Sequence, residues 1–288
     1  MTITLAESAG FCFGVKRAVE TVYRLLDEDK STVCTLGPII HNEQVVNDLA
    51  SRGVRVVSTP EELETAEDVT LVIRSHGVSA NIVDTLQNKG ICFEDATCPF
   101  VKKIHETVKT YSEQSYRIII FGSKDHPEVQ GILGWVKNEG IVIETEEEAN
   151  QFSLANPNEK ICIVAQTTFN YKKFQDLVEI FSKKGYDIIA VNTICNATST
   201  RQREAEELAS QSDAMIIIGG KHSSNSRKLY EICKNQCENT FFIQTVDDLK
   251  EVTFDSFTSL GITAGASTPN NIIQEVVEAC QKQVLQNC

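Results

Sequence analysis

Three cysteines stand in similar local sequences, each just before a segment with the apolar spacing of an amphipathic helix. They lie in AGFCFGVKRAVETV (9–22), DATCPFVKKIHETV (95–108) and NTICNATSTRQREAEEL (192–208). A thiol at a helix start lies beside free N–H groups and the positive end of the helix dipole, which lower its pKa. Cys12, Cys98 and Cys195 are therefore suited to act as thiolates that hold a metal or a cluster.

Three thiolates without a fourth partner would leave one iron of an iron–sulfur cluster open. Most such clusters have four cysteine ligands, and an open iron serves catalysis rather than simple electron transfer. The alternative is three ordinary buried cysteines, because free cysteine is among the most buried residue types. Their matched positions in the chain favour ligation.

The chain has ten cysteines and no CxxC pair. In a reducing compartment such a chain is not expected to form a disulfide framework. We interpret the seven remaining cysteines as structural, with the first three in core strands: Cys34, Cys92, Cys162, Cys233, Cys237, Cys280 and Cys288.

The segments that follow the three cysteines also match one another. Each predicted helix leads to a strand that ends in glycine, at TVCTLG (32–37), YRIIIFG (116–122) and DAMIIIGG (213–220). The glycines at 37, 122 and 219 lie 25, 24 and 24 residues after the cysteines at 12, 98 and 195. A polar loop with a histidine comes next in each third of the chain, and a further strand then ends in small polar residues.

Helices that alternate with short β-branched strands predict α/β units with parallel sheets. The sequence thus predicts three repeated α/β domains with mostly parallel sheets around a pseudo-threefold axis and a central cluster site. We assign the domains to 13–97, 98–193 and 194–288, with residues 1–12 adding to the third. Ligands collect at the carboxyl ends of parallel strands, so the polar loops are expected to face one cavity.

The polar loops contain groups that can bind an anion or move a proton. Histidine can donate hydrogen bonds to an anion and carry charge near neutral pH. His41, His76 and His126 stand in such loops, whereas His105, inside a predicted helix, is expected to be structural. Glu128, at the start of a helix, could pass a proton to a leaving hydroxyl or simply favour the helix start.

Hydroxyl and amide groups occur where further helices begin. The segment KHSSNSRK (221–228) contains Ser223, Ser224 and Asn225, and GAST (265–268) contains Ser267. These residues could cap helices or bind phosphate at a positive helix end. Neither segment is a P-loop, and no GxGxxG is found, so nucleotide hydrolysis and dinucleotide binding lack their usual signatures.

The charge and the apolar pattern of the sequence argue against several classes of protein. The formal net charge is −13, which disfavours nucleic acid as a partner. The apolar runs have the length of strands, so no membrane span is expected. The N-terminus lacks a basic region followed by an apolar stretch, which argues against a secretory signal and for the cytoplasm.

The ordered motifs resemble one known family over essentially the whole chain, the iron–sulfur 4-hydroxy-3-methylbut-2-enyl diphosphate reductases. The motifs that carry the resemblance are AGFCFGVKRAV, GPIIHN, RSHGV, DATCPFVKKIH, GSKDHPEVQG, AQTT, ICNATSTRQ, GGKHSSNS and TAGAST. The resemblance implies a [4Fe–4S] cluster on the three cysteines, whose fourth iron binds the substrate hydroxyl. It implies reductive removal of that hydroxyl as water to give isopentenyl and dimethylallyl diphosphates.

The resemblance also implies roles for individual residues. Catalytic roles fall to Glu128, Thr167 and His126. Contacts with the substrate fall to His41, His76, His126, Thr167, Thr198, Ser223, Ser224, Asn225 and Ser267. The implied electron donor is ferredoxin or flavodoxin, and the chain is expected to be a cytoplasmic monomer.

Two alternatives of other classes stay open at this stage. One is a non-catalytic iron–sulfur or zinc protein that senses redox state, which would need no anion pocket. The other is a protein that binds a sugar phosphate or nucleotide and has incidental cysteines, which would tolerate Cys→Ser changes.

Overall fold

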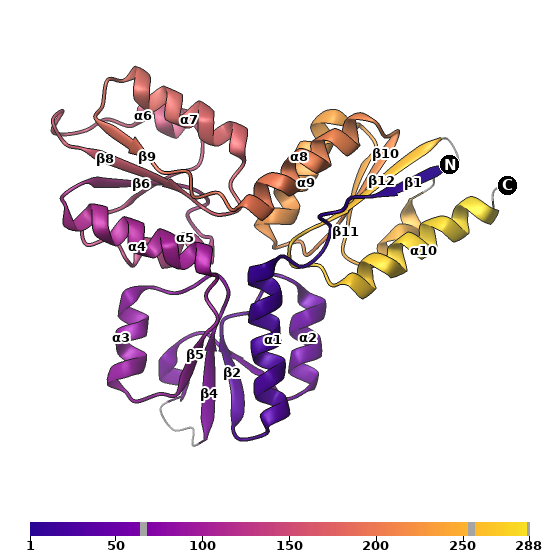
Figure 1. The fold of residues 1–288 in the computed structure, drawn as a ribbon, viewed down its shortest axis with the longest axis horizontal. Coiled ribbons are helices and arrows are strands. Elements are labelled where there is room, and N and C mark those ends of the chain that lie inside the picture. The colour runs from indigo at the N-terminus through magenta and orange to yellow at the C-terminus, as the bar shows by residue number, and fades with distance from the viewer. Residues whose placement is uncertain (64–67, 253–256, 287–288) are drawn as a thin grey trace. The chain divides into compact units, whose positions relative to one another are not determined.

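The computed structural model describes residues 1–63, 68–252 and 257–286 (Figure 1). Its strands form three sheets of four strands each, and all neighbouring strands are parallel. The prediction of three α/β repeats with parallel sheets is confirmed, and their arrangement about a pseudo-threefold axis stays a prediction. Among the described helices, none has the length and apolar character needed to cross a membrane.

The chain divides into two compact units. The terminal unit comprises residues 1–16, 41–48 and 196–288, and the central unit comprises residues 17–40 and 49–195. The terminal unit contains one of the sheets, and the central unit contains the other two. The three predicted domain boundaries stay predictions.

The first sheet of the central unit has the strand order β3-β2-β4-β5. Helix α1 (Phe13–Glu28) leads into it. The elements that follow are β2 (Thr32–Leu36), α2 (Glu43–Ser51), β3 (Arg55–Val57), the 3-10 helix η1 (Pro60–Leu63), β4 (Val69–Ile73), α3 (Ala80–Asn88) and β5 (Phe93–Asp95).

The second sheet of the central unit has the order β7-β6-β8-β9. Its elements are α4 (Pro99–Glu113), β6 (Arg117–Phe121), α5 (Pro127–Leu133), β7 (Ile141–Ile143), α6 (Glu146–Gln151), β8 (Ile161–Ala165), α7 (Tyr171–Lys183) and β9 (Ile188–Ala190). This repeat and the first thus have the same order of helices and strands, with α6 in the place of η1.

The sheet of the terminal unit has the order β1-β12-β10-β11. Its elements are α8 (Asn196–Ser210), β10 (Ala214–Ile218), α9 (Ser224–Gln236), β11 (Thr240–Ile243), the 3-10 helix η2 (Val246–Glu251), β12 (Ser259–Ala264) and α10 (Asn270–Gln286). The N-terminal strand β1 (Thr2–Leu5) completes it by pairing with β12.

Strand β6 shows why the central strands are continuous apolar runs. Its residues Ile118 and Ile120 face a core formed with α4 and α5, whereas Ile119 and Phe121 face a second core formed with α7. Successive side chains of a strand point to opposite faces, so a sheet covered on both faces needs apolar residues at every position. In this repeat, His126 and Thr167 accordingly lie in the loops after β6 and β8.

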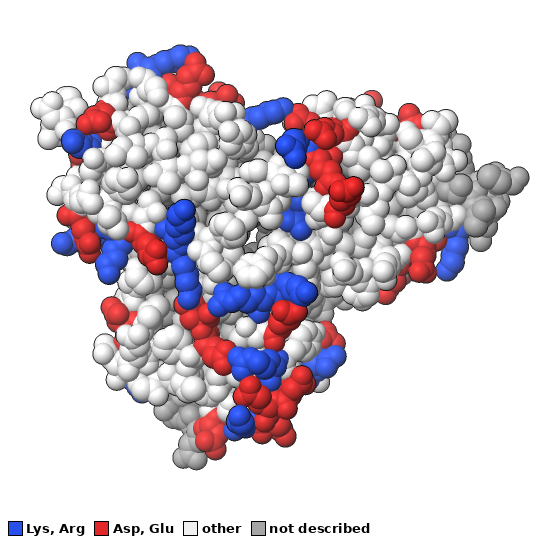
Figure 2. All heavy atoms as spheres, viewed as in Figure 1, with Lys and Arg blue, Asp and Glu red and all other residues white. Residues whose placement is uncertain are grey.

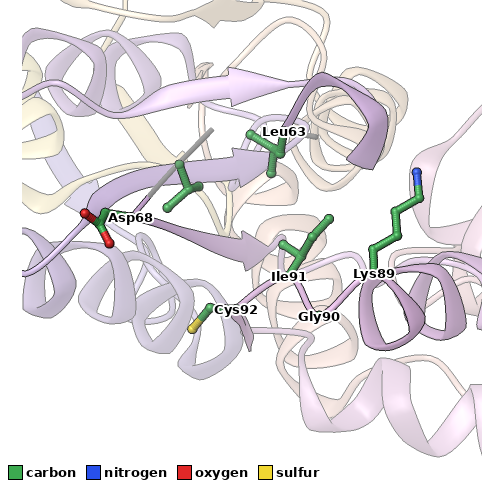
Figure 3. A pocket seen from close by; sticks show the side chains of 7 residues that line it. Leu63, Asp68, Lys89, Gly90, Ile91 and Cys92 are labelled. Carbon is green, nitrogen blue, oxygen red and sulfur yellow. The ribbon is translucent and has the colours of Figure 1, made fainter. Parts of the chain in front are cut away.

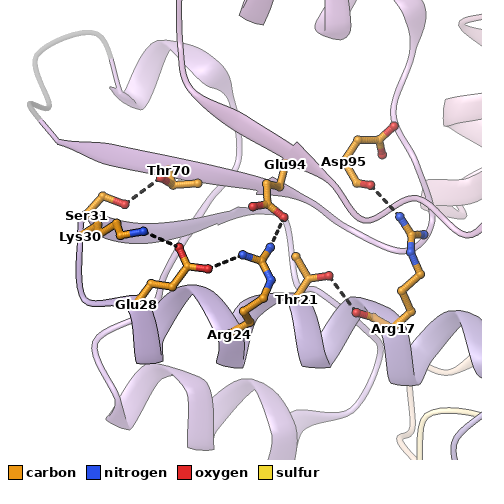
Figure 4. Close-up of polar contacts among 9 residues, drawn as sticks. All are labelled: Arg17, Thr21, Arg24, Glu28, Lys30, Ser31, Thr70, Glu94 and Asp95. Atoms are coloured by element: carbon orange, nitrogen blue, oxygen red, sulfur yellow. Dashed lines mark hydrogen bonds and ion pairs between the residues drawn. The ribbon is translucent and has the colours of Figure 1, made fainter.

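Opposite charges are interleaved on the surface near α1, in the lower part of Figure 2. Arg24 pairs with both Glu28 and Glu94, and Glu28 also pairs with Lys30 (Figure 4). Exposed pairs of this kind contribute little to stability, because water and salt screen them. The negative net charge is therefore not spread as one uniform field over this face.

Candidate functional site

The three predicted ligand cysteines lie directly before helices α1, α4 and α8, as predicted. Each is half-buried, and none is in a disulfide. The carbonyl of Cys12 accepts the N–H of Lys16 at 2.9 Å, and that of Cys98 accepts the N–H of Lys102 at 3.0 Å. Both bonds close the first turn of the helix that follows the cysteine.

The backbone of each cysteine is held by a matching hydrogen bond. The N–H of Cys98 donates to the carbonyl of Ser75 at 3.0 Å, and that of Cys195 donates to the carbonyl of Thr167 at 3.1 Å. The N–H of Cys12 donates to the carbonyl of Ala266 at 3.2 Å. The acceptors belong to the loops after β4, β8 and β12, which are the equivalent strands of the three repeats. The cysteines are thus fixed in the same way in all three.

Most other described cysteines are in a different environment. Cys34 and Cys162 are buried in strands β2 and β8, as predicted, and Cys233, Cys237 and Cys280 are also buried. Burial raises the pKa of Cys162 and Cys233 to about 12 and that of Cys280 to about 11. These thiols stay protonated and are poor ligands, because a metal binds the thiolate. Cys288 lies outside the described residues.

The prediction that Cys92 is a core strand residue is wrong. Cys92 is exposed and precedes β5, which begins at Phe93. It lines a hollow of about 670 Å³ together with Asp68 and Lys89 (Figure 3). An edge position explains the error, because an apolar residue beside a short strand need not be covered by a helix. None of the predicted site residues lines this hollow.

Two predicted histidines of the central unit lie together. The rings of His76 and His126 meet edge to face, with centroids 5.5 Å apart. His126 is the N-cap of α5, and its Nδ1 accepts the N–H of Glu128 at 3.1 Å. Because Nδ1 accepts this bond, the neutral ring carries its proton on Nε2 and can donate it to an anion.

Glu128 is almost completely buried and bonds to Thr167 in the loop after β8. Its carboxylate accepts the N–H of Thr167 at 2.6 Å and the hydroxyl of Thr167 at 2.7 Å. Burial raises the pKa of Glu128 to about 7, although the two bonds from Thr167 act in the opposite direction. A carboxyl that titrates near neutral pH can give up and regain a proton during turnover. Thr167 also connects Glu128 to Cys195 through its carbonyl.

The polar loops of the terminal unit also bring predicted residues together. Ser223 caps α9, and the amide of Asn225 is buried, with its oxygen accepting the N–H of Ala266 at 2.8 Å. Among the described residues, the Nδ2 of Asn225 has no hydrogen-bond partner. The hydroxyl of Ser267 donates to the carbonyl of His41 at 3.1 Å. A buried N–H₂ without an acceptor favours an anionic ligand, since an unmade bond is costly.

Thr198 and Ser224 lie in the first turns of helices. Thr198 is buried in α8, three residues after Cys195, and Ser224 begins α9. Each unit therefore contains its own group of predicted residues. In the central unit these are Cys98, Cys195, His76, His126, Glu128 and Thr167. In the terminal unit they are Cys12, His41, Thr198, Ser223, Ser224, Asn225 and Ser267. Their convergence on one cavity stays a prediction.

Two arginines near the cysteines were not among the predicted residues. Arg17 donates to the carbonyl of Thr97, directly before Cys98, at 2.9 Å. It also donates to the carbonyl of Asp95, three residues before Cys98, at 3.1 Å (Figure 4). Arg201 is buried and donates to the carbonyl of Gly10, two residues before Cys12. The signal in the sequence was a basic residue five or six positions after a repeat cysteine, here Cys12 and Cys195. Their carbonyl partners are visible only in the tertiary structure.

Comparisons with known proteins identify one family. The family profile described as LytB protein matches residues 3–281. A relative from Caldanaerobacter subterraneus subsp. tengcongensis is 45% identical over 279 residues, covering 96% of each chain. A relative from Clostridioides difficile is 45% identical over 277 residues, covering 96% of this chain and 98% of the relative. Both relatives are named 4-hydroxy-3-methylbut-2-enyl diphosphate reductase.

Solved structures give the same result. A structure described as (E)-4-hydroxy-3-methyl-but-2-enyl diphosphate reductase is 44% identical, with a TM-score of 0.68 and coverage of 98% of this chain and 100% of that one. A structure described as the E-1-hydroxy-2-methyl-but-2-enyl-4-diphosphate reductase from Plasmodium falciparum is 28% identical, with a TM-score of 0.90 and coverage of 96% of this chain and 86% of that one. The prediction that the chain is an oxidoreductase of this kind is confirmed. Sequence and fold together show that the chain belongs to the LytB protein family.

Proposed function

We propose that the chain reduces 4-hydroxy-3-methylbut-2-enyl diphosphate to isopentenyl and dimethylallyl diphosphates, with a [4Fe–4S] cluster on Cys12, Cys98 and Cys195. One observation carries the cluster assignment. Each of the three cysteine N–H groups donates to the loop after an equivalent strand, at 3.0 to 3.2 Å. Ordinary core cysteines need no common backbone arrangement in three repeats. The names of the relatives supply the substrate.

The residues fit such a cluster in their chemistry. The three thiols are half-buried at helix starts, whereas the pKa of the buried Cys162, Cys233 and Cys280 thiols is raised to about 11 or 12. Three thiolates leave one iron without a protein ligand, as a substrate hydroxyl requires. When bound, the cluster supplies electrons and an iron that polarises the hydroxyl.

The chain's own residues then bind the diphosphate and move protons. The Nε2–H of His126, the ring of His76 and the unpaired Nδ2 of Asn225 are donors for phosphate oxygens. His41, Ser223, Ser224 and Ser267 complete this anion site, and Thr198 lies beside it in the proposal. At the starts of α5 and α9, the positive ends of the helix dipoles also attract the anion.

Glu128 and Thr167 deliver protons in this proposal. The reaction consumes two electrons and two protons. The C–O bond to the hydroxyl breaks, one proton leaves with the oxygen as water, and the other forms the new C–H bond. Glu128, with a pKa of about 7 and a hydroxyl of Thr167 at 2.7 Å, can pass a proton to the departing oxygen.

The remaining parts of the proposal concern the surroundings of the enzyme. The electrons come from ferredoxin or flavodoxin. Thiolate ligands need a reducing compartment, so we assign the enzyme to the cytoplasm, where it acts as a monomer.

Anaerobic reconstitution tests the proposal. Wild type should bind about four irons per chain, turn brown and consume the diphosphate substrate with a chemical reductant. Cys98→Ser should lose or alter the cluster, whereas Cys92→Ser, at an exposed position, should match wild type. Equal iron content and spectra in Cys98→Ser and wild type would contradict the ligand assignment. A brown wild-type protein that leaves the substrate unchanged would favour a redox sensor instead.

A further inference from the structure

A seam of close backbone contacts runs through the central unit, between residues 77–80 and residues 131–135. The N–H of Ala80 donates to the carbonyl of Gly134 at 3.3 Å, and the indole N–H of Trp135 donates to the carbonyl of Val78 at 2.8 Å. Gly131 lies against the carbonyl of Gly77, and a Cβ at Gly134 would meet the Cβ of Ser79 at 2.1 Å. Glycine is required where two backbones approach this closely.

His105 of α4 fills the space beside this seam. Its ring is 5% exposed and stacks on Trp135, with centroids 5.2 Å apart and planes 16° apart. The ring also lies against Gly77, where φ is +74° and an added Cβ would meet it at 2.7 Å. Among the described residues, the Nε2 of His105 has no hydrogen-bond partner. Burial lowers the pKa of His105 to about 4, so the ring is neutral near pH 7.

An apolar side chain would avoid the cost of that unpaired nitrogen. Histidine supplies a flat ring that stacks on the indole of Trp135 and lies against the backbone of Gly77. The prediction that His105 is structural rather than a ligand-binding residue agrees with this position.

Both sides of the seam lead directly to predicted site residues. His76 immediately precedes Gly77, and His126 and Glu128 form the first turn of α5, whose far end carries Gly131. The contact between the rings of His76 and His126 therefore depends on how residues 77–80 and α5 are held together. A change in the spacing between residues 77–80 and residues 131–135 would move His76 through the adjoining turn and His126 through the short helix α5.

We propose that His105 and Trp135 are positioning residues that set the spacing of His76 and His126, and through it the affinity of the enzyme for diphosphate. The second part rests on the proposed function, in which both histidines bind diphosphate. The first part concerns the protein without ligand and is independent of it. Neither His105 nor Trp135 touches the substrate in this proposal.

Histidine NMR on uniformly ¹⁵N-histidine-labelled protein tests the spacing directly, because the chain has only five histidines. Trp135→Leu removes the stack and the bond to Val78, while Trp135→Phe keeps a ring and loses only the bond. Ring signals of His76 and His126 should move strongly in Trp135→Leu and His105→Leu, and less in Trp135→Phe. The matched control is Tyr186→Leu, which breaks the Phe152–Tyr186 ring pair in the core on the other face of the sheet. The control should leave both signals in place.

Titration with inorganic diphosphate supplies the functional readout. The dissociation constant should rise about 10-fold in Trp135→Leu and less in Trp135→Phe, against less than 2-fold in the control. Unmoved His76 and His126 signals in a folded Trp135→Leu or Trp135→Phe protein would overturn the positioning role. Moved signals with unchanged affinity would overturn the link to binding. If wild type itself showed no response of these histidines to diphosphate, the proposed anion site would be wrong, while the ligand-free spectra would still decide the role of the seam.

Discussion

Glu128 should make the central unit less stable as the pH rises. Its pKa is about 7 in the folded protein, against 4.5 for an ordinary carboxyl, because burial disfavours the ionised form. Relative to its value at high pH, the free energy of unfolding is larger when such a carboxyl is protonated in the fold, and this contribution is fully present below pH 4.5. It is lost as the pH rises through 7. The difference between the two pKa values corresponds to about 3 kcal/mol.

The substitution Glu128→Gln removes this dependence while keeping both contacts with Thr167. The amide carbonyl can accept the N–H of Thr167, and the amide N–H₂ can donate to the hydroxyl oxygen of Thr167. At pH 8 the variant should therefore be more stable than wild type by about 2–3 kcal/mol, and near pH 4.5 the two should be similar.

The comparison must be between variant and wild type, because His105 titrates in the same range with the opposite sign. Its pKa is lowered from 6.5 to about 4, so its contribution is full above pH 6.5 and is lost as the pH falls through 4. In wild type the two trends partly cancel. The difference between wild type and Glu128→Gln isolates the carboxyl.

Urea unfolding measures this difference, with the fluorescence of Trp135 as the signal. Trp135 is the single tryptophan of the chain and lies in the same unit as Glu128. Metal is removed first, since a bound cofactor adds stability of its own. The control is Glu106→Gln, at an exposed position in α4 of the same unit. Its difference from wild type in the free energy of unfolding should not increase with pH. If the difference in the free energy of unfolding between Glu128→Gln and wild type stayed constant from pH 5 to pH 8, the inference that burial raises the pKa of Glu128 would be refuted.

Four further results are expected. Turnover in Glu128→Gln should fall by about 10²-fold or more, with cluster spectra unchanged, as measured by steady-state kinetics. Thr167→Val, which loses the hydroxyl bond at 2.7 Å, should raise the pKa of Glu128 further and move the alkaline limb of the rate profile up by about one pH unit. Ser223→Ala combined with Asn225→Ala should weaken inorganic diphosphate binding before it affects the cluster, as calorimetry can show. The NMR signal of His105 should stay constant from pH 8 to about 5.5 and titrate near pH 4.

The repeat of cysteine, helix and strand could be recognised from the sequence alone. Each of its parts is a local pattern: a turn before apolar residues at helical spacing, then an apolar run that ends in glycine. Helices α1, α4 and α8 begin directly after the predicted cysteines, and β2, β6 and β10 follow in the predicted places. Apolar spacing reports which faces are covered, so it is sufficient for elements of this kind.

Cys92 and Glu128 show where local patterns are insufficient. The run around Cys92 has the composition of a core strand, yet its coverage depends on helices elsewhere in the chain. For Glu128, the sequence left proton transfer and a helix-start preference equally open. The choice depends on burial and on Thr167, a partner 39 residues away. Neither the burial of a side chain nor a hydrogen-bond partner far away in the sequence can be predicted from neighbouring residues.

By itself, the amino-acid sequence determined the α/β repeats, the helix-start cysteines and the family to which they belong. Only the tertiary structure decided that three cysteine N–H groups share one type of bond, that burial raises the pKa of Glu128 to about 7 and that His105 contacts Trp135 and Gly77. The physical reason is range. Helix and strand formation follow from residues a few positions apart, whereas hydrogen-bond partners, dielectric environment and packing slots are set by segments that meet only after the chain has folded.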